Sequence, residues 1–181
     1  MTFDESQVDC QIPCLQLVAE GKADMPPASF RRRVKLAIRR RLSPARERAL
    51  KTYTNGLMNR FAALTSRSGK PAAPQTRAAT PHLKAGDSVR VRSREEVEAT
   101  LNHWKQLKGC TFMNEMWTYC GTTQRVLRLL ERFVDERDLS VKTAKGIVLL
   151  EGVMCAGTAD FGRCDRSCFY FWREEWLEKI V

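Results

Sequence analysis

The sequence lacks several features that define common classes of protein. No apolar run approaches the roughly 18 consecutive residues of a membrane-spanning helix. The opening stretch MTFDESQVDCQIPC is acidic and polar, whereas a secretory signal begins basic and continues apolar. No phosphate-binding glycine loop, H-E-x-x-H motif or G-x-S-x-G motif occurs. We therefore expect a cytoplasmic protein without a membrane-spanning helix, and these motif-defined enzyme classes are excluded.

Histidine is scarce, and this limits the chemistry of the seven cysteines. A cysteine nucleophile needs a neighbouring base, which is usually histidine, and the chain has only His82 and His103. The single carboxylates Glu115 and Asp160 are weak signals of acid–base catalysis. We expect no catalytic residue set, so the sequence favours a binding or accessory protein over an enzyme. In a reducing compartment the cysteines are expected to be free thiols or metal ligands rather than disulfides.

The formal net charge of +10 comes from the first half of the chain. Residues 1–84 hold 16 basic and 6 acidic side chains, whereas residues 85–181 hold 15 of each. Within the first half, residues 29–65 are predicted to form a basic, amphipathic helical hairpin. Phe30, Val34, Ile38 and Leu42 recur every fourth residue, as the apolar face of a helix requires. Ser43 and Pro44 are typical of an N-cap and a first helical turn, so a second helix is expected to begin there.

The second helix carries an expected apolar stripe of Ala49, Leu50, Tyr53, Leu57, Phe61 and Leu64. The first helix is a candidate docking surface, whose basic residues are Arg31, Arg32, Arg33, Lys35, Arg39, Arg40 and Arg41. An acidic protein or a partner enzyme is the expected partner, and nucleic acid or an anionic membrane surface stay open as alternatives. A solvated helix face accounts for the same charges.

Composition divides the chain into four parts. Residues 66–84 are rich in proline and small residues without apolar periodicity, which is typical of a linker. Residues 1–28 are expected to be poorly ordered. They include Cys10 and Cys14. Pro13 between them limits any helix that would bring the two cysteines onto one face, so no role is assigned to them. Residues 85–181 are expected to form the folded domain.

The folded domain is predicted to be α+β, with a small, strongly bent antiparallel sheet and short helices. Polar and apolar residues alternate over residues 88–92, as in a strand. Ser93 and Glu96 then form a capping box that opens a helix, with Val97, Leu101 and Trp104 expected on one face. Strands are also expected from about residue 125 and over residues 146–155, followed by an aromatic strand that passes into a helical turn. The large aromatic and methionine side chains are predicted to be core: Met113, Met116, Trp117, Phe169, Phe171, Trp172 and Trp176.

Five sequence blocks fall in order within residues 83–181: GDSVRVRSREEVEATL, GCTFMNEMWTYCG, RVLRLLERFVDERD, GIVLLEGVMCAG and GRCDRSCFYFWREEWLEKI. This set resembles a bacterial family of small, cysteine-rich, SH3-like proteins, some of which are encoded near natural-product or glycan biosynthesis genes. The resemblance implies an SH3-like barrel and a constellation of cysteines, and it implies no established activity. The first 80 residues lie outside it.

Four cysteines of the folded domain make a candidate metal site. Cys155 ends an apolar strand, Cys164 and Cys168 lie in the segment after it, and Cys120 precedes a glycine at another turn. Turns of this kind bring thiolates from separate segments around one metal. Cys110 is a possible fifth ligand.

The irregular C-x8-C-x3-C spacing fits an iron–sulfur cluster slightly better than zinc, whose structural sites usually contain C-x2-C. The leading hypothesis is a metal-binding accessory or electron-transfer protein that acts with a partner enzyme. A metal-free SH3-like interaction module with packed cysteines, and a small metal-dependent biosynthetic enzyme, remain the alternatives.

Overall fold

A computed structural model describes residues 18–20, 26–27, 30–65, 82–136, 138–158 and 161–180. The helices are α1 (Phe30–Arg41), α2 (Pro44–Thr65) and α3 (Arg94–Thr100), and the 3-10 helices are η2 (Asn114–Tyr119) and η3 (Glu174–Trp176). The strands are β1 (Ser88–Val91), β2 (Gln106–Leu107), β3 (Cys110–Thr111), β4 (Thr123–Leu129), β5 (Arg132–Asp135), β6 (Ser140–Thr143), β7 (Ile147–Leu150), β8 (Met154–Thr158), β9 (Gly162–Phe169), β10 (Trp172–Arg173) and β11 (Leu177–Lys179).

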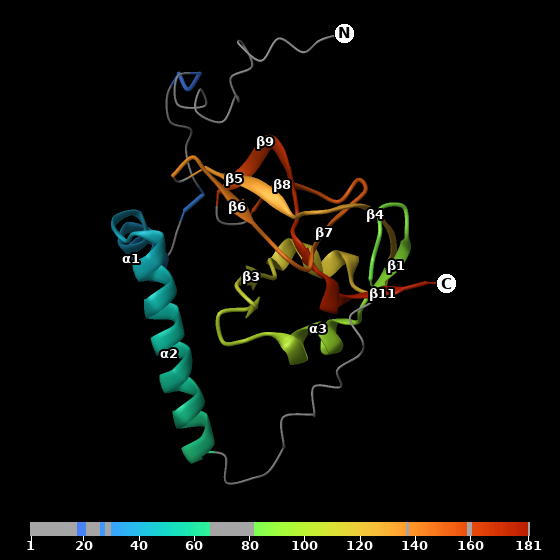
Figure 1. Cartoon of the computed structure of the whole chain (residues 1–181). Helices are drawn as coiled ribbons and strands as arrows, with labels where there is room; N and C mark the ends of the chain where they lie inside the picture. The colour runs from blue at the N-terminus through green and yellow to red at the C-terminus, as the bar shows by residue number, and fades with distance from the viewer. Residues whose placement is uncertain are drawn as a thin grey trace.

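The two N-terminal helices lie beside the β-domain, which comprises the described part of residues 82–180 (Figure 1). Ser43 separates the helices, because its carbonyl oxygen accepts from Glu47 N at 2.9 Å and its hydroxyl accepts from Arg46 N at 3.4 Å. Both predicted helices are therefore present, and they divide at Ser43 as expected. None of the described helices is both long and apolar enough to cross a membrane.

The β-domain is built on a five-stranded antiparallel sheet with the order β10-β7-β4-β1-β11. Its edge strands, β10 and β11, are joined only by the three residues of η3. In a flat sheet, four strand spacings would separate these edges by about 19 Å. The 3-10 turn from Arg173 to Leu177, which rises about 2.0 Å per residue, spans only about 8 Å. The sheet must therefore curve strongly, as predicted, and an irregular register between Val126 and Arg128 provides one bend.

The mixed α and β composition and the antiparallel sheet are as expected. The strands described do not close into a complete barrel, because β10 and β11 are not hydrogen-bonded to each other. Three further two-stranded ladders project from the sheet within the described residues, namely β2–β3, β5–β6 and β8–β9.

The core lies against the concave sheet and is dominated by tryptophan, phenylalanine and branched aliphatic residues. Its fully or nearly fully buried members are Leu83, Val89, Val91, Val97, Phe112, Met116, Val126, Val148, Leu150, Val153, Tyr170, Trp172, Trp176 and Leu177. Trp176 Nε1 donates to Thr100 Oγ1 at 3.0 Å, so its polar atom is satisfied inside the core. The predicted core positions of Trp172, Trp176 and Met116 are confirmed, whereas Phe171 is 45% exposed.

The capping box of α3 is present as predicted: Glu96 N donates to the Ser93 hydroxyl, and Ser93 N donates to the Glu96 carboxylate. The helix ends at Thr100, however, before Trp104. Asn102 accepts two backbone N–H bonds, from Trp104 and Gln106, each at 2.9 Å. This local alternative to a helical ladder turns the chain into β2.

The apolar segment 146–155 forms two strands rather than the expected one. A turn at Glu151 and Gly152 separates β7 from β8, and Gly152 has φ +68°. This turn directs β8 out of the main sheet, so that Cys155 belongs to the separate β8–β9 ladder.

Candidate metal centre and a neighbouring cleft

The β8–β9 hairpin places two of the predicted ligands opposite each other. In its antiparallel ladder Cys155 is the register partner of Cys168, and Gly157 is the partner of Arg163. Between these two pairs, residues 164–167 of β9 face only Ala156 of β8. Cys164 therefore belongs to a bulge of four residues, in which Ser167 has φ +54°.

Gly157 is required for this hairpin to close. Its φ is +122°, and a Cβ atom there would lie 2.1 Å from the carbonyl oxygen of Gly162 on the facing strand. No larger residue fits this close approach of two backbones.

The Cys155 thiol lies in a partly buried setting. Gly157 N donates to Cys155 Sγ at 3.4 Å, and Tyr170 is a neighbour. Burial, together with charge and hydrogen-bond interactions with Cys155, raises the pKa of Tyr170 to about 12. Cys168, across the ladder, is exposed. One thiol of the pair thus packs against the core and the other reaches solvent.

Cys164 is also exposed, and it shares a cationic neighbour with Cys168. The pKa of Arg166 is raised, chiefly by its hydrogen bonds to Glu136 and in smaller part by the Cys168 and Cys164 thiols. Arg166 Nη1 donates to Glu136 Oε2 at 2.8 Å, which ties the bulge to the β5–β6 hairpin. The guanidinium therefore lies near both thiols.

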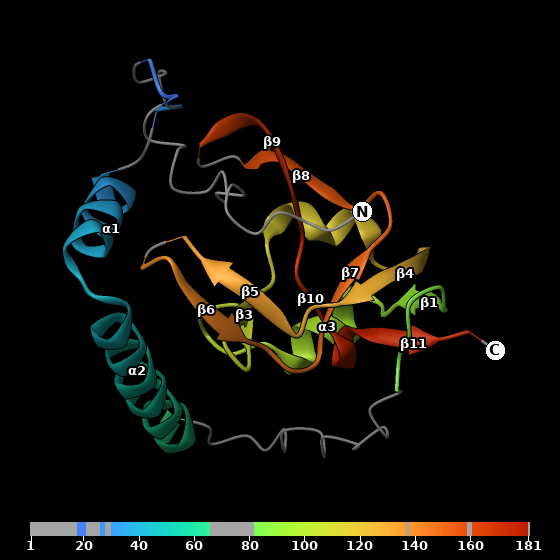
Figure 2. The same ribbon diagram turned by 45° about the horizontal axis from the view of Figure 1, so that its top comes forward.

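Cys120 follows η2 at the edge of the same region. It is half-buried against the core cluster, and burial raises the pKa of its thiol. The preceding Tyr119 packs against Tyr170, with ring centroids 6.3 Å apart. In both views η2, drawn in yellow, lies beside the base of the β8–β9 hairpin (Figures 1 and 2). The charges that act on the Cys120 thiol come from side chains of α3, so this thiol lies near α3.

The predicted ligands are only partly gathered. Cys155 and Cys168 are paired and Cys164 shares Arg166 with Cys168, whereas Cys120 lies near α3. Within the described ranges, no three Cys, His, Asp or Glu side chains already form a group able to hold a metal ion. Cys10 and Cys14 lie outside those ranges. A complete thiolate site would need the bulge of residues 164–167 to move toward the core.

Cys110 lies away from the hairpin, at the start of β3. Its thiol donates to the carbonyl oxygen of Phe171 at 3.3 Å, and burial raises its pKa to about 11. The thiol is therefore protonated near neutral pH and bound to backbone. The structure does not bring this possible fifth ligand together with the hairpin thiols.

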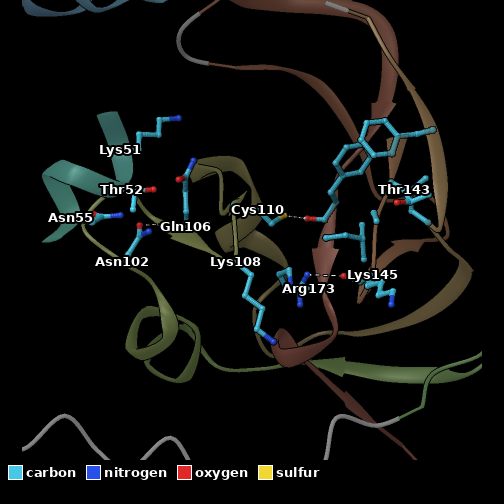
Figure 3. Close-up of a pocket in the computed structure, with 16 residues that line it drawn as sticks. Lys51, Thr52, Asn55, Asn102, Gln106, Lys108, Cys110, Thr143, Lys145 and Arg173 are labelled. Atoms are coloured by element: carbon cyan, nitrogen blue, oxygen red, sulfur yellow. Dashed lines mark hydrogen bonds between the residues drawn. The ribbon is translucent and has the colours of Figure 1, made fainter. Parts of the chain in front are cut away.

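Cys110 lines a cleft of about 710 Å³ between α2 and the β-domain (Figure 3). Lys51, Thr52 and Asn55 of α2 lie next to Asn102 and Gln106, with Thr143 and Lys145 on the other side of the view, and Phe133, Ile147 and Phe171 supply apolar surface. The sequence held no sign of this cleft, because its walls come from segments far apart in the chain.

The charges of the cleft are largely engaged in ion pairs. Lys51 binds Glu47 at 2.8 Å, and Arg173 binds Glu175 through two nitrogens at 3.0 Å each. Lys108 also binds Glu175, at 2.5 Å. No histidine lies among the lining residues to activate Cys110. The cleft therefore offers hydrogen-bonding groups but no prepared nucleophile.

The predicted docking residues Arg33 and Arg41 are exposed on α1. The side chains of Arg31, Arg32, Lys35, Arg39 and Arg40 lie outside the described residues. His82 and His103 are exposed.

The chain has no significant match to a protein-family model, to a curated protein sequence or to a solved structure.

Proposed function

We propose that the β-domain is a thiolate metal-binding domain in which Cys120, Cys155, Cys164 and Cys168 hold an iron–sulfur cluster or a zinc ion. The domain would serve as an accessory or electron-transfer component of a partner enzyme in the cytoplasm. The observation that carries the proposal is the ladder register that sets Cys155 opposite Cys168, with Cys164 on the same hairpin.

Directly opposed residues of an antiparallel ladder point to the same face, with Cβ atoms about 4.5–5.5 Å apart. Two thiolates on one zinc ion, each about 2.3 Å from the metal, lie about 3.8 Å apart. Rotation of the two side chains can bring their sulfur atoms to this separation, so Cys155 and Cys168 suit a shared metal without any change of register.

The third proposed ligand, Cys164, belongs to the bulge of this hairpin. Residues 164–167 face a single residue of β8, so a shift of Cys164 breaks no ladder pair on either side of the bulge. A site with four thiolates is anionic, and Arg163 and Arg166 bring positive charge to the same strand. Bound iron or zinc would supply redox or structural chemistry, and the four thiols would hold it.

The test is anaerobic purification of the full chain, followed by an absorbance spectrum and elemental analysis of the same sample. We expect either iron with sulfide or stoichiometric zinc. Cys164→Ala and Cys168→Ala should lose the metal, whereas Cys110→Ser, a matched control in another part of the fold, should retain it. Well-folded protein with neither metal would overturn the proposal, and loss of metal from Cys110→Ser alone would overturn the ligand set.

A metal-free interaction module is the second candidate, because Cys110, Cys120 and Cys155 all pack against the core as small apolar side chains do. We also propose that the domain is SH3-like. The last strand returns to pair with the first, and three residues join the two sheet edges, which supports a small barrel left partly open.

A further inference from the structure

Helix α2 turns its polar side toward the β-domain and its apolar side outward. Lys51, Thr52 and Asn55 line the cleft (Figure 3). Leu50, Tyr53 and Leu57, spaced as one helix face, are 50%, 71% and 42% exposed. An amphipathic helix that belongs only to its own domain buries its apolar stripe against that domain. Here the stripe is left for another surface to cover.

Helix α1 repeats the pattern. Phe30, Val34 and Ile38, at four-residue spacing, are 79%, 41% and 49% exposed. Two consecutive helices therefore each carry an exposed apolar stripe. Large apolar side chains exposed along both helices indicate an interaction surface.

The charge of the same two helices indicates the sign of charge that the partner surface must carry. Residues 30–65 contain eleven arginines and lysines and a single acidic residue, Glu47. Glu47 is buried and binds Lys51, so it contributes little negative potential to the surface. Arg33, Arg41 and Arg46 are exposed. A second copy of this chain would bring the same positive charge to the contact and be repelled, so the covering surface must be anionic.

We propose that α1 and α2 form a docking arm for an anionic lipid bilayer, lying in the headgroup region with their apolar stripes toward the acyl chains. A helix with one apolar face and a lysine- and arginine-rich remainder binds such a surface through buried apolar area and attraction to anionic lipid. A nucleic acid would satisfy the arginines but leave both apolar stripes exposed to water. A bilayer satisfies both features without any requirement for a matching groove.

The test is co-sedimentation of the full chain with large vesicles of phosphatidylcholine alone or of phosphatidylcholine mixed with phosphatidylglycerol. The wild-type chain is expected to bind the mixed vesicles and not the neutral ones. Leu50→Asn combined with Leu57→Asn should weaken binding about tenfold, because two partly exposed apolar side chains no longer enter the membrane. Thr52→Ala combined with Asn55→Ala, on the opposite side of the helix, is the matched control and should bind within about twofold of wild type.

Helix content measured by circular dichroism, and the thermal midpoint of the β-domain, check that each variant is folded. No binding to phosphatidylglycerol vesicles would overturn the proposal. Equal binding by wild type and the leucine variant would also overturn it, since the arm would then act by charge alone, as for a polyanion or an acidic protein. Vesicle binding should persist in Cys164→Ala, so this test succeeds or fails independently of the metal site.

Discussion

The pairing of Cys155 with Cys168 predicts that oxidation of the metal-free protein forms one particular disulfide. Opposed residues of an antiparallel ladder have Cα atoms about 4.5–5.5 Å apart, and disulfides join Cα atoms about 4.4–6.8 Å apart. The bond is therefore expected to form without backbone movement. With glutathione disulfide as oxidant, the two thiols lose two hydrogen atoms and the oxidant is reduced to two glutathione molecules.

The size of the effect follows from the loop that the bond closes. The segment from Cys155 to Cys168 is about 14 residues long, and cross-linking such a loop stabilises the folded state by about 3 kcal/mol through the unfolded chain. Urea unfolding of the oxidised and reduced proteins measures this difference. Intact mass, lower by about 2 Da after oxidation, and peptide mapping identify the bond.

Two variants separate this prediction from its rival, a bond between Cys164 and Cys168. Cys164→Ser should still oxidise and gain the same stability, whereas Cys168→Ser should form no intramolecular bond on this hairpin. A mapped Cys164–Cys168 bond, or a Cys155–Cys168 bond that lowers the free energy of unfolding, would show that the hairpin does not have the register described here.

Three further predictions follow, of which the first two are measured by urea unfolding and the third by the rate of oxidation. Burial favours the neutral form of the Glu175 carboxyl, but hydrogen bonds from Arg173 and Lys108 outweigh it. They hold the pKa of Glu175 at about 2, below its ordinary value of 4.5. The ionised carboxylate of Glu175 contributes fully to the free energy of unfolding above about pH 4.5, and this contribution is lost as the pH falls toward about 2. Glu175→Gln should therefore lower the free energy of unfolding by about 3 kcal/mol at pH 7 and hardly at all near pH 2. Glu178→Gln, which removes an exposed ion pair, should cost below about 1 kcal/mol, and equal losses from the two variants would refute the argument. Ser93→Ala removes the N-cap of α3 and should cost about 1 kcal/mol, and an unchanged midpoint would show that the cap is not formed in solution. Gly157→Ala should disrupt β8–β9 and slow disulfide formation, whereas Gly109→Ala, at φ +84° but in open space and away from this hairpin, should leave the oxidation rate unchanged; equal rates in both variants would contradict the tight approach at Gly157.

The parts of the fold that were predictable are those set by neighbouring residues. The helix start at Ser43, the capping box of Ser93 and Glu96, and the strand now assigned as β4 all depend on local spacing and turn chemistry. Trp104, predicted on the face of this helix, lies beyond the end of α3 because Asn102 offers the backbone a competing set of hydrogen bonds.

The candidate site was less predictable, because it depends on which strands pair. The spacing of Cys155 and Cys168 indicates proximity in the chain, but only the turn at Gly152 and the close approach at Gly157 set them opposite each other. Cys110 looked equivalent in sequence and lies against Phe171 instead, because β3 belongs to another ladder. Periodicity likewise located the apolar stripe of α2 but could not say whether the β-domain would cover it.

The pairing of β1 with β11 has a consequence for how the protein is made. Arg90 on β1 binds Glu178 on β11, 88 residues later in the chain. On the ribosome, β1 emerges early but lacks one of its two neighbours until β11 has left the exit tunnel. The bare edge of β1 is exposed to other chains throughout that interval. Folding of this sheet is therefore completed only after synthesis has passed Lys179, and the nascent domain depends until then on being kept apart from its copies.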